Sequence, residues 1–148
     1  MPSGEKETTR CFIDTNIWLY AFIDSGDARK RGLATEVISQ NNVVISTQVI
    51  NETCANLLKK ASFPEASIRQ LVAAFYEKYA VMDIERETLL VASDLRQKNK
   101  LSFWDSVIVA SALRSDCDVL YSEDTQDSLG VESKLTVIDP FKAKQEKT

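Results

Sequence analysis

An α/β fold with a mostly parallel central sheet is predicted by three features of this 148-residue chain. Short apolar segments alternate with longer segments whose apolar residues recur at helical spacing, a pattern typical of βα units. A chain of this length fits one domain with a single core. Its content of 44% hydrophobic and 27% charged residues is that of a globular protein. We therefore expect an open, doubly wound sheet of four or five strands with helices on both faces.

The strands are predicted where short runs of apolar, mostly β-branched or aromatic residues occur. In chain order they are 11–13, 43–45, 81–82, 119–121 and 135–138. The segment 81–82 is the weakest of these because it is so short. Pro140 stops the last strand, because proline has no N–H to donate to a sheet ladder.

The helices are predicted from apolar residues spaced three and four apart, together with capping residues at their starts. They cover about 16–22, 28–40, 47–60, 64–79, 85–98 and 104–113. Ser46 or Thr47 caps the third, Pro64 suits the first turn of the fourth, and Ser102 caps the last. Residues 10–141 form the expected domain, with flexible tails at 1–9 and 142–148.

The chain contains no histidine, which narrows its possible chemistry. Ser-His-Asp and Cys-His catalytic arrangements are excluded, and so are the usual zinc hydrolase sites. Cys11, Cys54 and Cys117 are odd in number, widely spaced and free of a C-x-x-C pattern, so we expect buried free thiols. Any hydrolysis must therefore use carboxylates, lysine, hydroxyls or a metal ion held by oxygen ligands.

The distribution of apolar and charged residues bears on location and partners. The first ten residues are polar, and no stretch approaches the roughly 20 apolar residues that span a bilayer. We therefore expect a cytoplasmic protein without membrane contact. A net charge of −4 argues against a nucleic-acid partner unless the basic residues cluster locally. Short basic groups occur at 29–31, at 59–60, and at Arg96, Lys98 and Lys100, although such groups are often only solvated helix faces.

Two acids follow predicted strands, and each has an alternative interpretation. Asp14 comes directly after the first strand, where it could simply cap the next helix. Asp124 follows the fourth strand in a polar turn, where aspartate is favoured for local reasons. Glu123 and Asp127 are further acids of that turn and could be merely solvated.

Two more acids lie in predicted helices. Glu52 is at the border of the apolar face of its helix, where a solvated glutamate is the simpler interpretation. Asp105 shares a face with Ile108 and Val109, and a carboxylate there is costly unless it is paired or metal-bound. It could instead form a capping box with Ser102.

The joint placement of the four acids is more informative than any one of them. A right-handed parallel sheet brings Asp14, Asp124 and the helices that carry Glu52 and Asp105 toward one edge. Four carboxylates there would repel one another unless a divalent cation neutralised them. Oxygen ligands without histidine or thiolate select Mg²⁺ or Mn²⁺ over zinc.

Five segments resemble, in order and spacing, those of PIN-domain ribonucleases and more narrowly of VapC-type toxins of bacterial toxin–antitoxin pairs. These segments are FIDTNIWLYAF, QVINET, LSFWDSVIVASAL, YSED and VIDPF, and the resemblance runs from about residue 10 to residue 141. It implies strand order 3-2-1-4-5 and a catalytic cluster of Asp14, Glu52, Asp105 and Asp124. Asn16 and Ser122 would support the cluster, Ser122 standing where many relatives have threonine, and Asp127 would be a possible fifth acid. A cognate antitoxin and homodimerisation are implied as well.

The sequence hypothesis is an endoribonuclease that uses Mg²⁺ or Mn²⁺. Asp14 and Asp105 would hold the ion, with Asp124 completing or sharing the site. Glu52 would orient or help to deprotonate the attacking water, or support a second ion. A nuclease acting on DNA or flap structures would use the same acids, and a binding module could keep the fold without catalysis. A haloacid-dehalogenase-type site is disfavoured because Thr15 and Asn16 follow Asp14, where D-x-D-x-T would be needed.

Overall fold

The computed structural model describes residues 9–23, 26–123 and 130–143, and within them six strands form one sheet. The order across the sheet is β3-β2-β1-β4-β6-β5. The strands are β1 (Arg10–Ile13), β2 (Asn42–Ser46), β3 (Ala80–Met82), β4 (Val119–Tyr121), β5 (Gly130–Val131) and β6 (Leu135–Ile138). All neighbouring strands are parallel except β5 and β6, which pair antiparallel.

The predicted α/β class and the order of the five predicted strands are confirmed, since β6 is the fifth of them. The expected number of strands was too low by one. The strand that was missed, β5, has only two residues at the sheet edge, which is too short to show a period-two pattern. It exists because it pairs with β6 across a tight turn.

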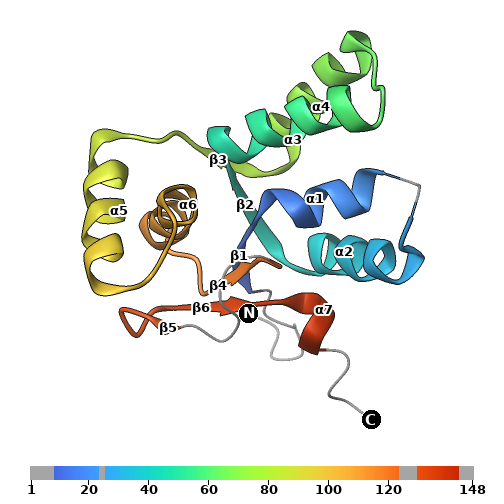
Figure 1. Ribbon diagram of the computed structural model, residues 1–148. Helices are drawn as coiled ribbons and strands as arrows, with labels where there is room; N and C mark the ends of the chain where they lie inside the picture. Colours follow the sequence, from blue (N-terminus) through green and yellow to red (C-terminus); the bar gives the residue numbers. More distant parts are fainter. Residues whose placement is uncertain (1–8, 24–25, 124–129, 144–148) are drawn as a thin grey trace, which may run out of the picture.

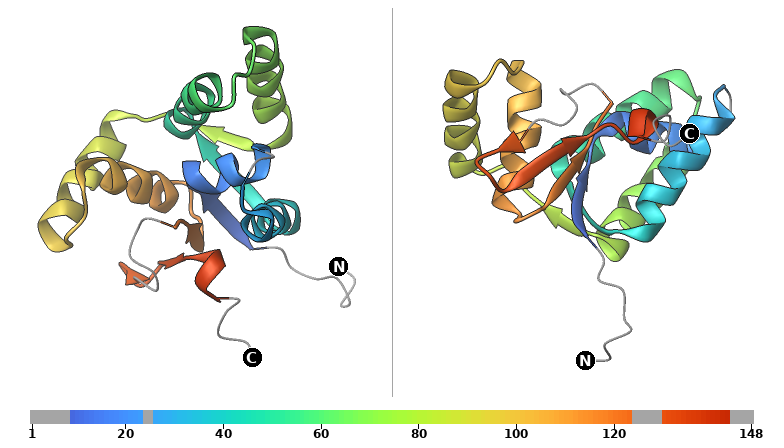
Figure 2. Two further views of the ribbon diagram at one scale, coloured as in Figure 1. Left: turned by 45° about the vertical axis from the view of Figure 1, so that its right-hand side comes forward. Right: turned by 90° about the horizontal axis from the view of Figure 1, so that it is seen from below.

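Helices cover both faces of the sheet, as predicted (Figure 1). They are α1 (Thr15–Phe22), α2 (Ala28–Gln40), α3 (Thr47–Lys60), α4 (Glu65–Lys78), α5 (Arg86–Lys98), α6 (Phe103–Arg114) and α7 (Pro140–Ala143). The views in Figure 2 place α5 and α6 on one side of the central strands and α1 and α2 on the other. The α3–α4 pair extends beyond the ends of β2 and β3.

Helices α3 and α6 begin at capping serines, close to the predicted positions. Ser46 accepts a hydrogen bond from the N–H of Val49, and Ser102 accepts one from the N–H of Asp105. Pro64 lies just before the first turn of α4, one residue earlier than predicted. The short helix α7 was not predicted. It begins at Pro140 and includes Lys142, so the expected tail at 142–148 starts inside it, while residues 1–8 and 144–148 lie outside the described chain.

The core is built around β1, which is the central strand and is almost wholly buried. Parallel strands covered on both faces favour continuous apolar runs, which explains the Cys-Phe-Ile sequence of β1. On the side of α1, Trp18 packs against Phe22, Phe75 and Tyr79. Its indole N–H donates a hydrogen bond of 3.1 Å to the carbonyl of Ile13. The start of α1 is thereby attached to the end of β1.

The chain reverses its direction across the sheet at β1, which places a topological switch point beside this strand. From β1 the chain proceeds to β2 and β3 on one side and then returns to β4 on the other. Ligands of doubly wound sheets bind outside the carboxyl ends of the strands at such a point. The structure therefore directs attention to the ends of β1 and β4.

All three cysteines are buried free thiols, as predicted. Burial raises the pKa of Cys11 from 9.0 to about 12, with the nearby Cys117 as a smaller cause. Burial also raises the pKa of Cys54 and that of Cys117. Among the helices of the described chain, none is long and apolar enough to cross a membrane.

Replacement of Trp18 by alanine is expected to lower the free energy of unfolding by about 3–5 kcal/mol, because it leaves a large cavity among aromatic rings. The matched control is Trp104→Ala, because Trp104 is 65% exposed and its loss should change stability by less than about 1 kcal/mol. Urea unfolding followed by circular dichroism measures both. Equal destabilisation by the two variants would contradict this description of the core.

Titration of Cys11 should make the protein less stable at alkaline pH. Below pH 9.0 the thiol is protonated in both states, whereas between 9.0 and about 12 only the unfolded chain releases its proton. The free energy of unfolding therefore falls as pH rises through this window. Cys11→Ala should lower stability at all pH values but reduce this slope, as measured by urea unfolding at a series of pH values. Parallel curves for variant and wild type would show that Cys11 does not cause the dependence.

Candidate active site

Asp14 lies at the carboxyl end of β1 and is 92% buried, with 8% of its surface exposed. Its N–H donates to the carbonyl of Tyr121 at 3.0 Å, which continues the β1–β4 ladder by one step. Its carboxylate Oδ1 accepts a hydrogen bond of 2.7 Å from the N–H of Thr15. Asp14 is therefore also the N-cap of α1, and the two interpretations of this residue are compatible.

Ser122 orients the Asp14 carboxylate from the neighbouring strand. Its hydroxyl is fully buried and donates a hydrogen bond of 2.8 Å to Oδ2 of Asp14. Its N–H donates to the carbonyl of Ile138, so the backbone of Ser122 is held by β6. Ser122 was predicted only as a support of the acidic cluster, and the structure shows it in contact with Asp14, 108 residues away in the chain.

Glu52 reaches the same region from α3, and hydrogen bonds reach both of its carboxylate oxygens. The hydroxyl of Thr15 donates to Oε1 at 2.9 Å, and the amide of Gln48 donates to Oε2 at 3.4 Å. The side-chain amide of Asn56 donates to the carbonyl of Glu52 at 2.8 Å. Gln48, Glu52 and Asn56 are spaced by four residues and therefore share one face of α3.

Asp105 comes from the first turn of α6 on the opposite side of the sheet. Ser102 accepts a hydrogen bond of 3.1 Å from the N–H of Asp105, which is the half of the predicted capping box that involves the serine side chain. The cap fixes where the helix begins, and the Asp105 side chain is half-buried. Asp105 therefore lies in the capped first turn of α6, and its side chain remains partly exposed.

These three acids line one cavity of about 320 Å³. Its walls are formed by Asp14, Thr15, Asn16, Gln48, Glu52, Asn56, Trp104, Asp105 and Ile108. Three of the four predicted catalytic acids and the supporting Asn16 are therefore brought together from α1, α3, α6 and the end of β1. The fourth acid, Asp124, and the possible fifth, Asp127, lie outside the described residues, so their roles stay predictions.

The chemistry of this cavity fits a hard cation in the kind of ligand it offers. Carboxylate, amide and hydroxyl oxygens line it, without a thiol, and such donors suit Mg²⁺ or Mn²⁺. Gln48, whose amide oxygen is buried with no hydrogen-bond partner, also lines this cavity. Within the described ranges, however, no three acidic or thiol side chains are grouped so that they could hold an ion together.

Several residues of the cavity wall were not predicted from the sequence. Thr15 and Gln48 hold Glu52, yet a threonine after a cap and a glutamine in a helix carry no distinctive signal. The spacing of Gln48 from Glu52 would have found the glutamine once Glu52 was accepted as a site residue. Trp104 carries no such signal, because adjacent residues of a helix point about 100° apart.

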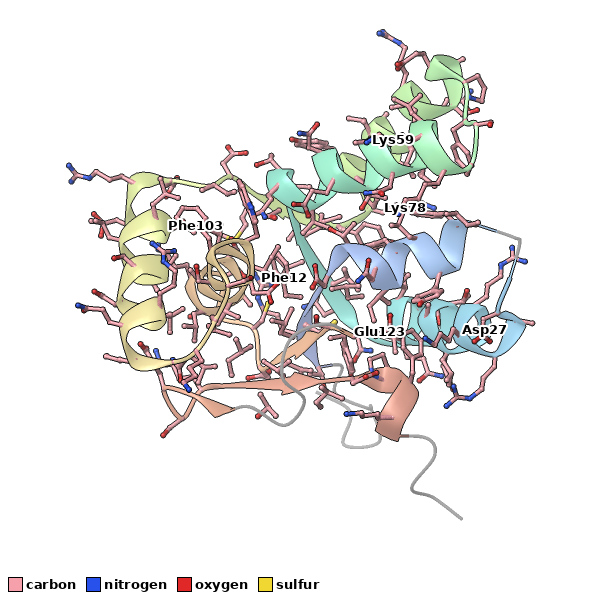
Figure 3. All side chains as sticks on the ribbon, in the orientation of Figure 1. Phe12, Asp27, Lys59, Lys78, Phe103 and Glu123 are labelled. Carbon is pink, nitrogen blue, oxygen red and sulfur yellow. The ribbon has the colours of Figure 1, made fainter. Side chains whose placement is uncertain are left out.

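Glu123, for which simple solvation was one possibility, is paired with Lys30 and Tyr20. Its carboxylate accepts hydrogen bonds from the Lys30 ammonium and from the Tyr20 hydroxyl, the latter at 3.0 Å. The Lys30 ammonium also lies 5.0 Å from the centre of the Tyr20 ring and 5.2 Å from that of Phe141. Hydrogen bonds to Glu123 and then to Tyr20 raise the pKa of Lys30. This network ties the residue before Asp124 to α1, α2 and α7. Glu123 is labelled in Figure 3.

The sequence matches the family model described as PIN domain over residues 11–128, which is most of the chain. This chain belongs to the PIN domain family. The match includes β1, α3, α6 and β4, from which the PIN domain presents its candidate site residues. The family resemblance inferred from sequence motifs is confirmed at this level. A comparison with curated protein sequences gave no significant match.

Solved structures share the fold of this PIN domain. VapC20 of Mycobacterium tuberculosis, a sarcin–ricin loop cleaving toxin, is 21% identical with a TM-score of 0.63, covering 78% of this chain and 91% of that one. A toxin–antitoxin complex from Klebsiella pneumoniae is 22% identical with a TM-score of 0.65, covering 88% and 97%. VapBC2 from Rickettsia felis, bound to a DNA fragment from its promoter, is 16% identical with a TM-score of 0.60, covering 88% and 99%. At such identities the likeness establishes a common fold.

Loss of the Ser122 hydroxyl should destabilise the PIN domain by about 1.5–3 kcal/mol, because the buried carboxylate of Asp14 then lacks one donor. Ser122→Ala would be compared by urea unfolding with Ser122→Thr, which keeps the hydroxyl and should stay closer to wild type. The control is Ser93→Ala on the exposed side of α5. If Ser122→Ala and Ser93→Ala have the same small effect, the hydrogen bond to Asp14 contributes no net stability.

Proposed function

We propose that this PIN domain is an endoribonuclease that hydrolyses RNA phosphodiester bonds with Mg²⁺ or Mn²⁺, and that it is the toxin of a cytoplasmic toxin–antitoxin pair. The observation that carries the proposal is the cavity into which Asp14, Glu52 and Asp105 converge from three separate elements. Family membership supports it, because residues 11–128, which match the PIN domain model, include all three acids.

The acids have distinct surroundings, and these suggest distinct tasks. Asp14 is buried and oriented by Thr15 and Ser122, which suits a carboxylate that must hold a ligand in one position. Asp105 is half-buried across the cavity and would bind the same ion, with Asp124 as the proposed third ligand. A divalent ion bound there would lower the pKa of a water molecule and stabilise negative charge on the phosphate.

Glu52 is suited to orient the attacking water rather than to serve as a main metal ligand. Donors from Thr15 and Gln48 constrain its carboxylate, so the direction of its remaining acceptor positions is set before a substrate binds. A carboxylate within hydrogen-bond reach of the water can align it and accept its proton as the bond to phosphorus forms. The bond from phosphorus to the 3′ oxygen breaks in the same displacement, and that oxygen takes up a proton and leaves as a 3′-hydroxyl, with the 5′-phosphate on the other product.

Basic residues near the cavity account for how an acidic protein could bind a polyanion. Lys60, in the last turn of α3, lines a neighbouring cavity of about 290 Å³ that shares Asn16 with the acidic one. Arg96 reaches the first turn of α6 from α5, where its guanidinium lies over Phe103. We place the phosphate chain between these two cations, and a bound metal ion would reverse the local sign of the acidic wall.

The proposal includes a cognate antitoxin and a homodimer as protein partners. Support for the antitoxin comes from structural relatives, since the Klebsiella pneumoniae structure is a toxin–antitoxin complex. The exposed side chains of Leu89 and Leu90 on α5 offer an apolar surface for a protein partner. Sedimentation of the purified chain, alone and with a co-expressed antitoxin, tests both associations.

Metal binding is expected to raise the thermal unfolding midpoint. A ligand that binds only the folded state stabilises by about 2.7 kcal/mol at 100 times its dissociation constant. Wild type should therefore unfold at a higher temperature in Mg²⁺ or Mn²⁺ than in EDTA, whereas Asp105→Asn should show little difference. Asp94→Asn on the exposed surface of α5 is the matched control and should respond like wild type. An unchanged wild-type midpoint up to millimolar metal would contradict the cation site.

Cleavage is expected to depend on the same side chains. Loss of an outer-shell partner of a metal ligand costs roughly 10- to 100-fold in metal affinity or activity. Asp14→Asn and Asp105→Asn remove proposed ligands themselves, so each should lower RNA cleavage by more than about 100-fold. Labelled single-stranded RNA, duplex RNA, single-stranded DNA and flap DNA are compared as substrates, with EDTA and Asp94→Asn as controls. Cleavage of DNA but not RNA would favour the related nuclease function. Metal binding without any cleavage would favour a binding module.

A further inference from the structure

Two large aromatic side chains are exposed on the first turn of α6. Trp104 is 65% and Phe103 55% exposed, whereas Trp18, the other tryptophan of the chain, is 1% exposed. The two exposed rings meet edge to face, with centroids 5.5 Å apart and an interplanar angle of 75°. This pair has no part in the core, and the proposed catalytic chemistry does not use it.

The aromatic pair is held in place from α5. The guanidinium of Arg96 lies 4.3 Å from the centre of the Phe103 ring, in the geometry of a cation–π contact. Arg96 also donates a hydrogen bond of 2.6 Å to the hydroxyl of Ser106, which is fully buried and itself donates to the carbonyl of Phe103. Figure 3 labels Phe103 on the side of α6 that faces α5. Trp104 therefore packs against a ring whose position is fixed.

Trp104 also forms part of the wall of the acidic cavity, together with Asp14, Glu52 and Asp105. A group bound at the carboxylates would therefore lie next to the indole ring. Large planar aromatic surfaces beside a phosphate-binding site are the usual means by which proteins bind unpaired nucleotides, because every base has a π-face.

We propose that Trp104, supported by Phe103 and Arg96, is a stacking platform for one unpaired nucleobase of the substrate, beside the phosphodiester bond that is cut. The proposal rests on the ribonuclease function and assigns to Trp104 a direct contact with the substrate. Bases inside a duplex are stacked on their neighbours and cannot offer a face to Trp104. Arg96 places a positive charge next to the platform for the phosphate chain.

Two observations favour a nucleotide over a protein as the occupant. The platform continues into the acidic cavity, and it includes a cation that suits a phosphate chain. The exposed aliphatic residues Leu89 and Leu90 lie at the other end of the α5–α6 pair, where Arg114 at the end of α6 contacts Glu85 at the start of α5. The platform is therefore separate from the apolar surface that would suit a protein partner.

Trp104 emission provides a direct test of stacking. In Trp18→Phe/Glu52→Gln protein with Mg²⁺, Trp104 is the only tryptophan and cleavage should be suppressed. Oligoadenylate of about ten nucleotides is expected to quench its emission in a saturable way. An abasic ribose–phosphate chain of the same length carries the same charge and should bind without quenching. Absence of quenching by both, or equal quenching by both, overturns the proposal.

Steady-state kinetics of Trp104 variants separate stacking from a structural role. With a single-stranded RNA substrate, Trp104→Ala should raise KM by roughly ten- to hundred-fold and leave kcat little changed. Trp104→Phe should restore most of the affinity, whereas Trp104→Leu, which is apolar but not aromatic, should not. Equal rescue by phenylalanine and leucine overturns stacking, and so does a change in sedimentation of Trp104→Ala, which would indicate a protein contact.

Failure of this proposal can be distinguished from failure of the proposed function. If wild type cleaves RNA and Trp104→Ala cleaves it with the same KM, the platform is wrong and the ribonuclease function stands. If wild type cleaves no RNA with Mg²⁺ or Mn²⁺, yet oligoadenylate still quenches Trp104 where the abasic chain does not, the platform stands and the catalytic proposal fails.

Discussion

The parallel pairing of β1 with β4 is the constraint on which the candidate site depends. It continues one step beyond the strands, because the N–H of Asp14 donates to the carbonyl of Tyr121. That step places Ser122 beside the Asp14 carboxylate, although the two residues are far apart in sequence. A shift of this register by one residue would turn Asp14 or Ser122 to the other face of the sheet. The geometry of the buried carboxylate is therefore set by the sheet and not by a loop.

Helix capping fixes the positions of the site residues, which explains why the local interpretations were compatible with the functional ones. Asp14 caps α1, Ser46 caps the helix that carries Glu52, and Ser102 caps the helix that carries Asp105. A capped first turn fixes where a helix begins and hence the direction in which each later residue points. The three helices start near the carboxyl edge of the sheet, so their caps also fix the positions of the acids around one cavity.

The distribution of charge reconciles an acidic protein with a proposed polyanionic substrate. A net charge of −4 describes the whole chain, but Asp14, Glu52 and Asp105 gather part of the negative charge into one cavity. Lys60 and Arg96 lie near this cavity on α3 and α5. By contrast, the Lys30 ammonium is already paired with Glu123, so it stabilises the fold near β4 and is less available to a phosphate. The positions of the basic side chains, and not the net charge of the chain, decide which of them could contact RNA.

The sequence by itself determined the fold class, the order of the long elements and three of the acids that share the cavity. It could do so because buried parallel strands, helical periodicity and capping residues leave local patterns that do not depend on distant contacts. Only the tertiary structure decided that β5 and α7 form, that Glu123 is paired with Lys30, and that Gln48, Thr15 and Trp104 border the site. The physical reason is that these features arise from contacts between segments far apart in the chain, for which short local patterns carry no signal.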